Sequence, residues 1–367
     1  TSNRTTMKLS LALSLLTASS IALGAPGHAH NHEHKREVTV VMTKYLESNP
    51  VTGATTPAAA ATSAAAAAAA SGAKSSTTIL QPVSSDSVAS TSASSSGSTS
   101  SKSPSSGSGF YSGAKGISYS PYTKSGSCKS ASVIKNDISL LSNFEVIRIY
   151  DIDCDSLEPI LSSLGSAQKL FVGIHDIDNI GDAVSKISSA FKGDFSKVHT
   201  ISVGNELVNF GTKTPSQIKS AIESARSKLS DIGYSGKVVS VDTLVAVEKN
   251  TDLCSCSDYI AVNSHAYWDG NVEPSNCGQW LKEQIENLSS ACNNGKDILI
   301  TETGWPNKGS SYGSCTPSQE NQETCIKSIV ETLGSKVFLF TTYNDYWKAA
   351  GSYGVEQNWG VFGDSDE

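Results

Sequence analysis

Apolar and polar positions alternate in two different periods from about Ala114 to the end of the chain. Short apolar runs rich in β-branched residues predict buried strands, and the segments between them have the spacing of amphipathic helices. The predicted strands cover 116–119, 146–150, 170–174, 198–203, 238–241, 259–262, 298–301 and 337–340. Eight such units between 114 and 367 predict an α/β fold of the TIM (β/α)8 barrel type, which takes roughly 250 residues.

The clearest helix signal follows Thr214 and Pro215, which have the chemistry of an N-cap and a first helical turn. Apolar residues then recur at helical spacing over 218–229, and they do so again over 180–191 and 326–333. Each of these helical segments lies between two predicted strands, as the barrel requires.

The chain before the barrel begins with the layout of a secretory signal peptide, which we predict over 7–25. Met7 and Lys8 precede an apolar-rich run of about 15 residues that ends in Gly24 and Ala25. A bilayer span needs roughly 20 apolar residues, so a membrane anchor is the less favoured alternative.

The next segment, 26–36, contains four alternating histidines and ends in Lys35 and Arg36. A dibasic pair in a secreted chain is typical of a processing site, so we expect 26–36 to be a propeptide. The histidines alone would suggest metal binding, but an extended polar segment gives them no fixed geometry. We therefore predict no metal site there.

Residues 37–113 have a low-complexity composition. They include an unbroken alanine run at 64–70, and Ser or Thr occupies 21 of the 34 positions from 75 to 108. Such a segment buries too little apolar surface to offset its ordering entropy, so we expect a disordered Ser/Thr/Ala-rich linker. Hydroxyl-rich tracts with proline are typical of O-glycosylated stalks, and a plain spacer without sugars is the alternative.

The formal net charge is -7 with histidine counted neutral, and the basic residues are scattered. This balance argues against nucleic acid and against an anionic membrane surface as partners. Every Trp lies after position 260, so only the predicted barrel can build a large core. We expect this folded domain to be a monomer.

Two glutamates stand where predicted strands end. Glu302 follows the apolar run 298–301, and Glu206 follows 198–203 in a similar way. Glycoside hydrolysis needs two carboxyl groups, because one protonates the leaving oxygen and the other attacks or shields the anomeric carbon. Taken singly, a glutamate at a strand end is more often an ion-pair or capping residue.

The barrel makes the spacing of the two glutamates informative. Their separation of 96 residues equals three units of the barrel, which places Glu206 after the fourth strand and Glu302 after the seventh. Both then lie at the C-terminal face, where barrel enzymes keep their chemistry. Strands three steps apart face each other across the mouth, so one sugar ring could lie between the two carboxyl groups.

Six strand-end motifs occur in order along the predicted barrel: Gly116-Ile-Ser-Tyr119, Ile147-Arg-Ile-Tyr-Asp151, Val203-Gly-Asn-Glu206, Val262-Asn263 with Tyr267, Thr301-Glu-Thr-Gly-Trp-Pro306 and Tyr343-Asn-Asp-Tyr-Trp-Lys348. They resemble the motifs of glycoside hydrolase family 17, the β-1,3-glucanases, over essentially all of 114–367. With its N-terminal part, the chain most resembles the fungal branch of soluble cell-wall glucosidases and cell-surface mannoproteins. The resemblance implies a retaining glycosidase that needs no cofactor.

The resemblance also implies roles for single residues. Glu206 is implied as the acid/base and Glu302 as the nucleophile, with carboxyl groups about 5 Å apart. Asn205 is implied as a partner of the sugar's 2-hydroxyl. Arg148 and Tyr267 are implied as groups that hydrogen-bond the nucleophile and keep it ionised.

Five more residues are implied as substrate-binding. Trp305 and Tyr119 offer flat faces for sugar stacking, and Asn263 belongs to the motif after the sixth strand. Asp345 and Lys348 resemble an acidic residue and a lysine of plant members.

Structural alternatives stay open for some of these residues. Arg148 could be an ion-pair partner of Asp151 or Asp153. Trp305 and Trp347 could be packing residues at the top of the barrel.

The chain departs from the plant pattern in two places. Plant β-1,3-glucanases commonly have Asn-Pro-Tyr-Pro-Tyr-Phe where this chain has Asn263-Ser-His-Ala-Tyr-Trp268, and His175 stands where a neutral polar residue is usual. These changes concern the subsites that bind single sugar residues of the substrate. They also concern whether water or a sugar hydroxyl accepts the glucosyl group. We expect His265 and His175 to be hydrogen-bonded pocket residues, and we predict no metal at Asp176 and Asp178.

All 8 cysteines lie within the predicted barrel, and an even number after a signal peptide predicts disulfides. Zinc is the alternative, which an oxidising compartment disfavours. Cys254 and Cys256 are too close for an easy mutual bond, so each is expected to pair elsewhere. Asn287-Leu-Ser289 is the N-glycosylation sequon of the mature part.

The sequence therefore predicts a secreted, extracellular enzyme that hydrolyses the β-1,3-glucan of a fungal cell wall. A β-1,3-glucan transglucosylase would use the same two glutamates, so the motifs do not separate transfer from hydrolysis. A structural or adhesive cell-wall mannoprotein with little turnover is the alternative outside enzymology.

Overall fold

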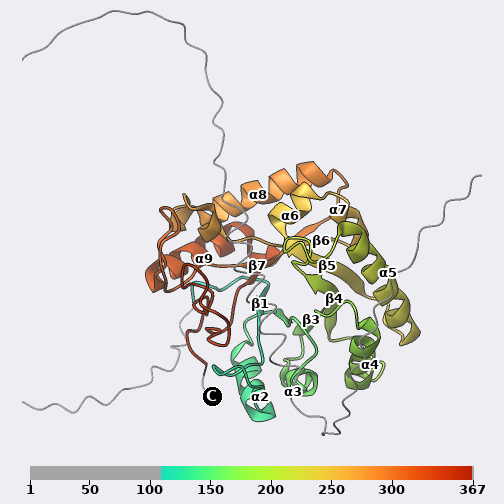
Figure 1. Cartoon of the computed structure of the whole chain (residues 1–367). Helices are drawn as coiled ribbons and strands as arrows, with labels where there is room; N and C mark the ends of the chain where they lie inside the picture. Colours follow the sequence, from blue (N-terminus) through green and yellow to red (C-terminus); the bar gives the residue numbers. More distant parts are fainter. Residues whose placement is uncertain (1–108, 366–367) are drawn as a thin grey trace, which may run out of the picture.

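The computed structural model describes residues 109–365, and the eight predicted strands form one closed parallel barrel (Figure 1). Each strand pairs with its neighbour in sequence, and β1 closes the ring against β8 through Ile117 and Leu339. The strands are β1 Gly116–Ser118, β2 Val146–Arg148, β3 Lys169–Ile174, β4 Val198–Asn205, β5 Lys237–Thr243, β6 Ile260–Asn263, β7 Ile298–Thr303 and β8 Val337–Leu339. The TIM barrel expected from the sequence is confirmed.

Helices lie around the ring and connect its strands (Figure 1). They are α2 Ala131–Leu140, α3 Leu157–Ser163, α4 Ile180–Phe191, α5 Pro215–Asp231, α6 Leu244–Lys249, α7 Leu253–Cys256, α8 Cys277–Cys292 and α9 Gln319–Leu333, with short 3-10 turns η1 Ala266–Asp269, η2 Pro274–Asn276 and η3 Gly334–Lys336. The predicted start of α5 is confirmed, because Thr214 and Gln217 form a capping box and Pro215 is the first helical residue.

The strand ends differ from the predicted ones at the carboxyl side of the barrel. β4 continues to Asn205 and β7 to Thr303, because these polar residues still pair with β5 and β8. In contrast, β2 already ends at Arg148 and β8 at Leu339. The end of an apolar run therefore marks a strand end only approximately, since polar side chains at the barrel mouth also belong to strands.

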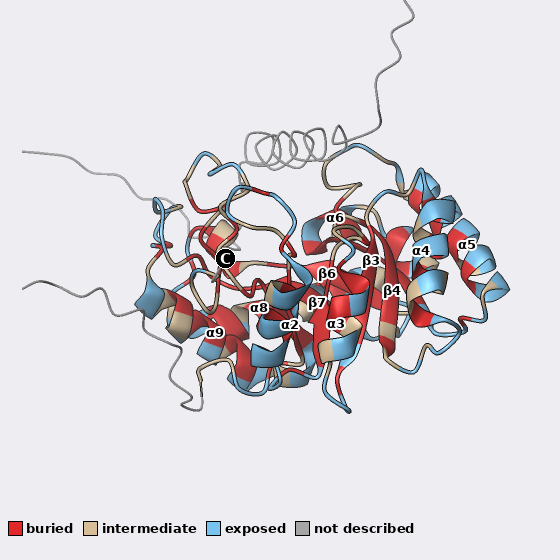
Figure 2. Cartoon of the chain, turned by 90° about the horizontal axis from the view of Figure 1, so that it is seen from below, coloured by how far each residue is buried: buried red, intermediate tan, exposed pale blue. Residues whose placement is uncertain are grey.

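Two layers of buried side chains stabilise the barrel. The larger layer lies between the strands and the inner faces of the helices, and Figure 2 shows the buried strands with helices that are exposed on their outer sides. The smaller layer fills the inside of the barrel and consists of Val146, Phe171, Val239, Val241, Ala261, Leu299 and Phe338. Successive residues of a strand point to opposite sides, so the strands supply both layers.

The packed chain begins slightly before the expected boundary at 114. The ring of Tyr111 stacks on Phe144 with centroids 5.7 Å apart and meets Phe362 edge to face at 5.1 Å. Phe110 also packs against the core. Residues 109–113 therefore belong to the barrel rather than to the linker.

Six of the cysteines form disulfides, which are Cys128–Cys154, Cys254–Cys292 and Cys277–Cys325. Cys256 and Cys315 are free thiols. The predicted disulfides are confirmed, and Cys254 pairs away from its neighbour Cys256. The expectation that Cys256 also pairs is wrong.

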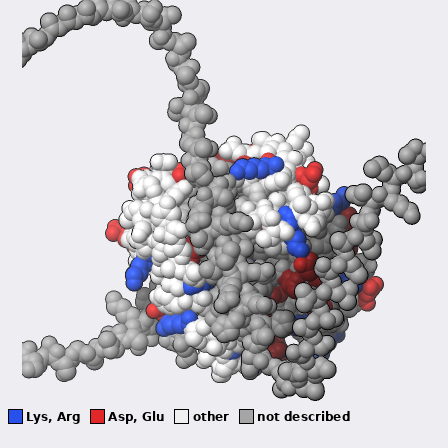
Figure 3. Space-filling view, in the orientation of Figure 1, with Lys and Arg blue, Asp and Glu red and all other residues white. Residues whose placement is uncertain are grey.

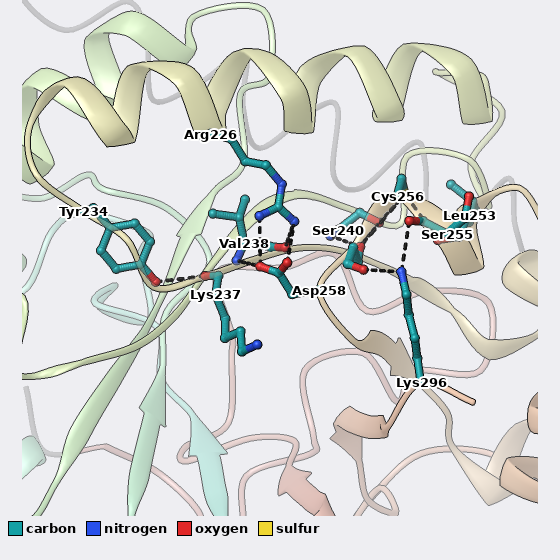
Figure 4. Close-up of polar contacts among 11 residues, drawn as sticks. Arg226, Tyr234, Lys237, Val238, Ser240, Leu253, Ser255, Cys256, Asp258 and Lys296 are labelled. Atoms are coloured by element: carbon teal, nitrogen blue, oxygen red, sulfur yellow. Dashed lines mark hydrogen bonds and ion pairs between the residues drawn. The ribbon is translucent and has the colours of Figure 1, made fainter. Parts of the chain in front are cut away.

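Cys256 lies in a tightly bonded region at the N-terminal ends of β5 and β6 (Figure 4). Its sulfur is 3.8 Å from Ser240 Oγ. Arg226 pairs with Asp258 at 3.0 Å, and Lys296 donates hydrogen bonds to two backbone carbonyls of the same loop. These contacts fix the loop that carries Cys256, whose thiol is free in the structure.

The predicted signal peptide (7–25), propeptide (26–36) and most of the linker (37–113) lie outside the described residues. Within 109–365, no helix is long and apolar enough to cross a membrane, and no three His, Cys, Asp or Glu side chains are grouped as a metal site would need. On the face seen in Figure 3, the described Lys and Arg side chains stand in separate places. The sequon residue Asn287 is exposed on α8.

Candidate active site

Glu302 lies in β7 near the carboxyl end of the barrel and is 5% exposed. Arg148, the last residue of β2, donates from Nη1 to Glu302 Oε1 at 2.8 Å and to the Thr301 carbonyl at 2.8 Å. The arginine is itself 1% exposed, so the surrounding protein shields this ion pair from water and strengthens it. The acidic partner of Arg148 is therefore Glu302.

Two aromatic side chains border the same carboxylate. His265 Nε2 lies 3.6 Å from Glu302 Oε2. Tyr150 packs under the Arg148 guanidinium, which is 4.5 Å from the centre of its ring. Burial raises the pKa of the Tyr150 hydroxyl, and the negative charge of Glu302 raises this pKa further. Tyr150 and His265 are thus immediate neighbours of Glu302.

Glu302 is held in its charged form. Burial alone would raise the pKa of Glu302, but the positive charge of Arg148 and the hydrogen bond with His265 outweigh burial. The pKa of Glu302 therefore lies below its usual range. An ionised carboxylate at neutral pH is the form that can attack an electrophilic carbon.

Glu206 follows β4 directly in a turn that directs its carboxyl group into the protein. Its backbone is left-handed, with φ +57°, an uncommon conformation for a residue other than glycine. The Glu206 N–H donates to the Val241 carbonyl of β5 at 2.9 Å. The side chain is 9% exposed, and its Oε1 accepts a hydrogen bond from Asn263 Nδ2 at 2.8 Å.

The pKa of Glu206 is shifted in the opposite direction to that of Glu302. Burial raises the pKa of Glu206, and the negative charge of Glu302 raises it further, whereas the bond from Asn263 lowers it. The net shift is upward. Glu206 therefore keeps its proton to higher pH than an ordinary glutamate, which suits a general acid.

Two asparagines connect the carboxyl groups. Asn205 Oδ1 accepts hydrogen bonds from Arg148 Nη2 at 2.8 Å and from Asn263 Nδ2 at 3.3 Å. Because Arg148 also bonds Glu302 and Asn263 also bonds Glu206, one continuous polar chain joins the two carboxyls. The structure thus brings these five predicted residues together.

The loop beyond Glu206 is held by Asp242 of β5, which is 3% exposed. Its carboxylate accepts backbone N–H bonds from Val208 at 2.9 Å and from Asn209 at 3.1 Å. These bonds fix the chain directly after Glu206 and so limit the freedom of that carboxyl group.

Asp345 and Lys348 form a further polar group on the Glu302 side. Lys348 Nζ lies 2.8 Å from Asp345 Oδ2 and 4.7 Å from the ring centre of Phe340. The buried Glu356 lies near both Lys348 and Glu302. Burial raises the pKa of Glu356 to about 7, with Lys348 opposing the rise and Glu302 adding to it.

Two predicted stacking residues do not present a face to a sugar. Tyr119 and Trp305 are both 0% exposed. The Tyr119 hydroxyl donates to Asp137 at 2.8 Å, and the indole N–H of Trp305 donates to the Thr316 carbonyl at 3.1 Å. Both rings are therefore packing residues at the top of the barrel. For Trp305, the sequence analysis named packing as the alternative to sugar stacking.

Tyr267 also takes a different place from the one expected. Its hydroxyl donates to the Ser310 carbonyl at 2.6 Å, and Tyr150 and His265 border Glu302 instead. The sequence held a signal for both, because Tyr150 is two positions after Arg148 and His265 two positions after Asn263, which is the spacing of residues on one strand face. Glu356 lies in an irregular segment after β8, where no such periodicity applies.

A family model described as "BtgE/BtgC glycoside hydrolase domain" matches residues 116–360. The chain is 50% identical over 252 residues to the probable family 17 glucosidase SCW10 of Saccharomyces cerevisiae, a match that covers 68% of this chain and 65% of that protein. It is 48% identical over 261 residues to the cell surface mannoprotein MP65 of Candida albicans, covering 71% of this chain and 69% of that protein. The chain thus spans just under two thirds of the length of SCW10.

Solved structures share the fold. The family 17 β-1,3-glucanosyltransferase of Rhizomucor miehei aligns with a TM-score of 0.59 at 21% identity, covering 70% of this chain and 96% of that one. An active-site mutant of the enzyme in complex with laminaritriose aligns equally well. The β-1,3-glucanase and allergen of Cryptomeria japonica pollen aligns with a TM-score of 0.52 at 16% identity, covering 68% of this chain and 95% of that one.

Proposed function

This chain belongs to the BtgE/BtgC glycoside hydrolase family, within glycoside hydrolase family 17, and from that premise we propose that it cleaves β-1,3-glucan with Glu206 as acid/base and Glu302 as nucleophile. The observation that carries the proposal is the different pairing of two buried carboxyl groups at the carboxyl end of the barrel: Glu302 pairs with Arg148 at 2.8 Å, whereas Glu206 accepts a hydrogen bond from the neutral amide of Asn263 at 2.8 Å. Carboxyl groups whose environments push their pKa values apart are suited to divide the roles of acid and nucleophile.

In the first step, a Glu302 oxygen attacks the anomeric carbon of the bound glucose. Glu206 donates its proton to the glycosidic oxygen as the bond from that oxygen to the anomeric carbon breaks, so the rest of the chain leaves as an alcohol. Arg148 and His265 hold the attacking carboxylate in place. The product of this step is a glucosyl ester on Glu302.

In the second step, Glu206 acts as the base. It takes a proton from water while the water oxygen attacks the anomeric carbon, and the ester bond to Glu302 breaks. Two inversions at one carbon restore its original configuration. This retaining mechanism requires the carboxyl groups to lie about 5–5.5 Å apart, and the short polar chain through Asn205 and Asn263 is consistent with a close pair.

Relatives support the substrate class and the location. The two solved relatives are named as a β-1,3-glucanosyltransferase and a β-1,3-glucanase, and SCW10 is named a glucosidase. MP65 is named a cell surface mannoprotein. With the signal peptide expected at 7–25, we place this protein outside the cell, in the fungal cell wall, and we take it to act there as a monomer.

The main alternative is a transglucosylase, in which a sugar hydroxyl replaces water in the second step. Both reactions pass through the same ester on Glu302. The two activities differ only in the acceptor, so the lengths of the products distinguish them.

The experiment is to incubate the purified full-length protein with β-1,3-linked glucose oligosaccharides and to measure product lengths. Shorter products alone support hydrolysis, longer products support transfer, and no change supports a structural cell-wall protein. Glu302→Ala should abolish either activity, and Glu206→Gln should lower kcat by about 10²–10⁴-fold. Glu158→Gln, on the exposed side of α3, is the matched control and should leave the rate unchanged.

A further inference from the structure

Two aromatic side chains that are distant in sequence meet at the carboxyl end of the barrel. Tyr122 lies in the loop after β1 and Trp347 in the loop after β8, and these strands are neighbours in the closed ring. Their ring centroids are 4.7 Å apart with planes tilted by 54°. Both side chains are partly exposed, unlike the wholly buried Tyr119 and Trp305.

The polar end of each ring is already bonded to protein. The Tyr122 hydroxyl donates to the carboxylate of Asp153, and Trp347 Nε1 donates to Asp345 Oδ1 at 2.9 Å. These bonds set the orientation of both rings. What each ring leaves exposed is therefore mainly its apolar surface. Lys348 Nζ also lies 5.3 Å from the centre of the Trp347 ring and is a further contact that fixes this side chain.

The loop that carries Tyr122 is also covalently fixed. The disulfide Cys128–Cys154 joins the loop after β1 to the loop after β2, next to Asp153. Tyr122 itself forms an isolated antiparallel bridge with Cys128. An aromatic pair that is held by a disulfide and by two hydrogen bonds loses little freedom when it binds a ligand.

A series of contacts connects the pair to Glu302. Trp347 bonds Asp345, which pairs with Lys348, and Lys348 Nζ lies over the ring of Phe340. The next contacts lead to Glu302, because Phe340 meets His265 with ring centres 5.3 Å apart and His265 Nε2 lies 3.6 Å from the Glu302 carboxylate. The pair therefore lies on the Glu302 side of the site, in loops that follow β1 and β8 and not in the loop after β4, where Glu206 lies.

We propose that Tyr122 and Trp347 form a binding subsite for a glucose residue of the part of the glucan chain that becomes attached to Glu302. This inference rests on the proposed function. Glu206 protonates the leaving oxygen, so the departing part of the glucan lies on its side, and the retained part extends toward β8 and β1. The flat C–H faces of a β-glucose ring are apolar and pack on aromatic surfaces through dispersion and C–H contacts.

A second aromatic group near the mouth does not compete for this role. Trp268, Tyr312 and Tyr353 meet one another edge to face, with centroids 5.2 to 5.9 Å apart. Each of these three rings is in contact with the other two. The Tyr122–Trp347 pair has no comparable third ring among the ring contacts of the described chain.

The test compares Trp347→Ala with Trp280→Ala in the full-length protein. Trp280 is the matched control because it is also partly buried and its indole N–H also donates to an aspartate, Asp269 at 3.1 Å, but it lies on α8 outside the barrel. We expect Trp347→Ala to lower kcat/KM for a β-1,3-linked glucose hexasaccharide by about 10-fold, the effect of losing one good contact. For 4-nitrophenyl β-glucoside, which has a single glucose and does not reach the pair, kcat/KM should stay the same.

A third variant separates the ring from its hydrogen bond. Trp347→Phe keeps a flat ring but loses the N–H to Asp345, so it should keep most of the preference for the hexasaccharide. If the tryptophan only supported Asp345, Trp347→Phe would behave like Trp347→Ala, and that result would overturn the subsite. Equal losses on both substrates in Trp347→Ala, or no loss on either, would also overturn it.

A binding experiment makes the inference independent of turnover. In the Glu302→Ala background, calorimetry with the hexasaccharide should show affinity about 10-fold weaker when Trp347→Ala is added and unchanged affinity when Trp280→Ala is added. A wild-type protein that degrades or extends no oligosaccharide would refute the proposed function, whereas binding that depends on Trp347 would still support the subsite. Hexasaccharide binding that does not change in Trp347→Ala refutes the subsite alone.

Discussion

Arg148 Nη1 lies 2.8 Å from Glu302 Oε1, and the two side chains are 1% and 7% exposed. This buried cation therefore makes the largest contribution to lowering the pKa of the proposed nucleophile, and His265 adds to it. The same guanidinium bonds Asn205 through its other terminal nitrogen at 2.8 Å, so it links the ends of β2, β4 and β7. One side chain thus contributes both to the charge of Glu302 and to the positions of the residues around it.

Replacing that cation should change the pH dependence of activity. Without the positive charge, Arg148→Gln should raise the pKa of Glu302 by about 1–3 units, because the ionised form loses its stabilising partner. The acid limb of kcat/KM against pH should move upward by a similar amount. Arg148→Lys keeps the charge and should keep the limb near its wild-type position, with a lower rate from poorer geometry. An acid limb that stays in place in Arg148→Gln would show that another group keeps Glu302 ionised.

The hydrogen bond from Asn263 to Glu206 should influence the pH at which kcat/KM falls on the alkaline side of its optimum. This bond favours the ionised form of Glu206, so Asn263→Ala should raise the pKa of Glu206 further. Activity, which needs protonated Glu206, should then persist to higher pH, although its maximum should fall. Thr301→Val is the control, because it removes only the hydroxyl that donates to Asn263 Oδ1 at 2.8 Å. A downward shift of the alkaline limb in Asn263→Ala would contradict this assignment.

Glu356 should make the folded state less stable at alkaline pH. Its pKa in the folded protein is raised to about 7, so the folded state binds its proton more tightly than the unfolded chain does. This stabilisation is complete below the unfolded pKa of about 4.3 and is lost as pH rises through about 7. Glu356→Gln cannot ionise and should lack this loss, which is at most about 4 kcal/mol.

The measurement is denaturant unfolding of both proteins at pH 5 and pH 8. Relative to wild type, Glu356→Gln should gain free energy of unfolding between the two pH values. Glu223→Gln, at an exposed position of α5, should show no such gain. Identical pH dependence of wild type and Glu356→Gln would rule out Glu356 as the source.

The disulfide between α8 and α9 should contribute to stability, whereas the free thiol of Cys256 should not. Cys277–Cys325 closes a loop with a sequence separation of 48, for which chain entropy predicts about 4 kcal/mol. The double change of Cys277 and Cys325 to Ala should therefore lower the Tm by several degrees in a thermal scan without reductant. Cys256→Ser should change the Tm by much less. Equal losses in both proteins would mean that local packing rather than the cross-link matters.

Most of the fold could be predicted from the sequence because barrel strands are buried on both sides. Such strands appear as continuous apolar runs, and the run 298–301 before Glu302 is typical. Because these runs are about equally spaced, counting them shows that Glu206 follows the fourth predicted strand and Glu302 the seventh. Cysteine pairing could not be predicted in this way, since it depends on which cysteines the fold brings together, and Cys256 and Cys315 are left as free thiols.

The site was predictable where a side chain belongs to a strand and less so where it belongs to a loop. Arg148 and Asn263 are the last residues of their strands, and their side chains bond the carboxyl groups of Glu302 and Glu206. Tyr267 lies in the short turn η1, whose direction turns its hydroxyl toward Ser310. Side-chain direction in such turns depends on tertiary packing, which a linear pattern does not specify.

The contact of Tyr111 with Phe144 and Phe362 determines where this protein can be shortened. A version that starts at 114 would lack Tyr111 and uncover two aromatic faces that it now covers. Uncovered aromatic surface promotes association between copies, so such a version would form aggregates more readily. Crystallisation or production of the isolated catalytic domain should therefore keep the chain from Gly109 onward.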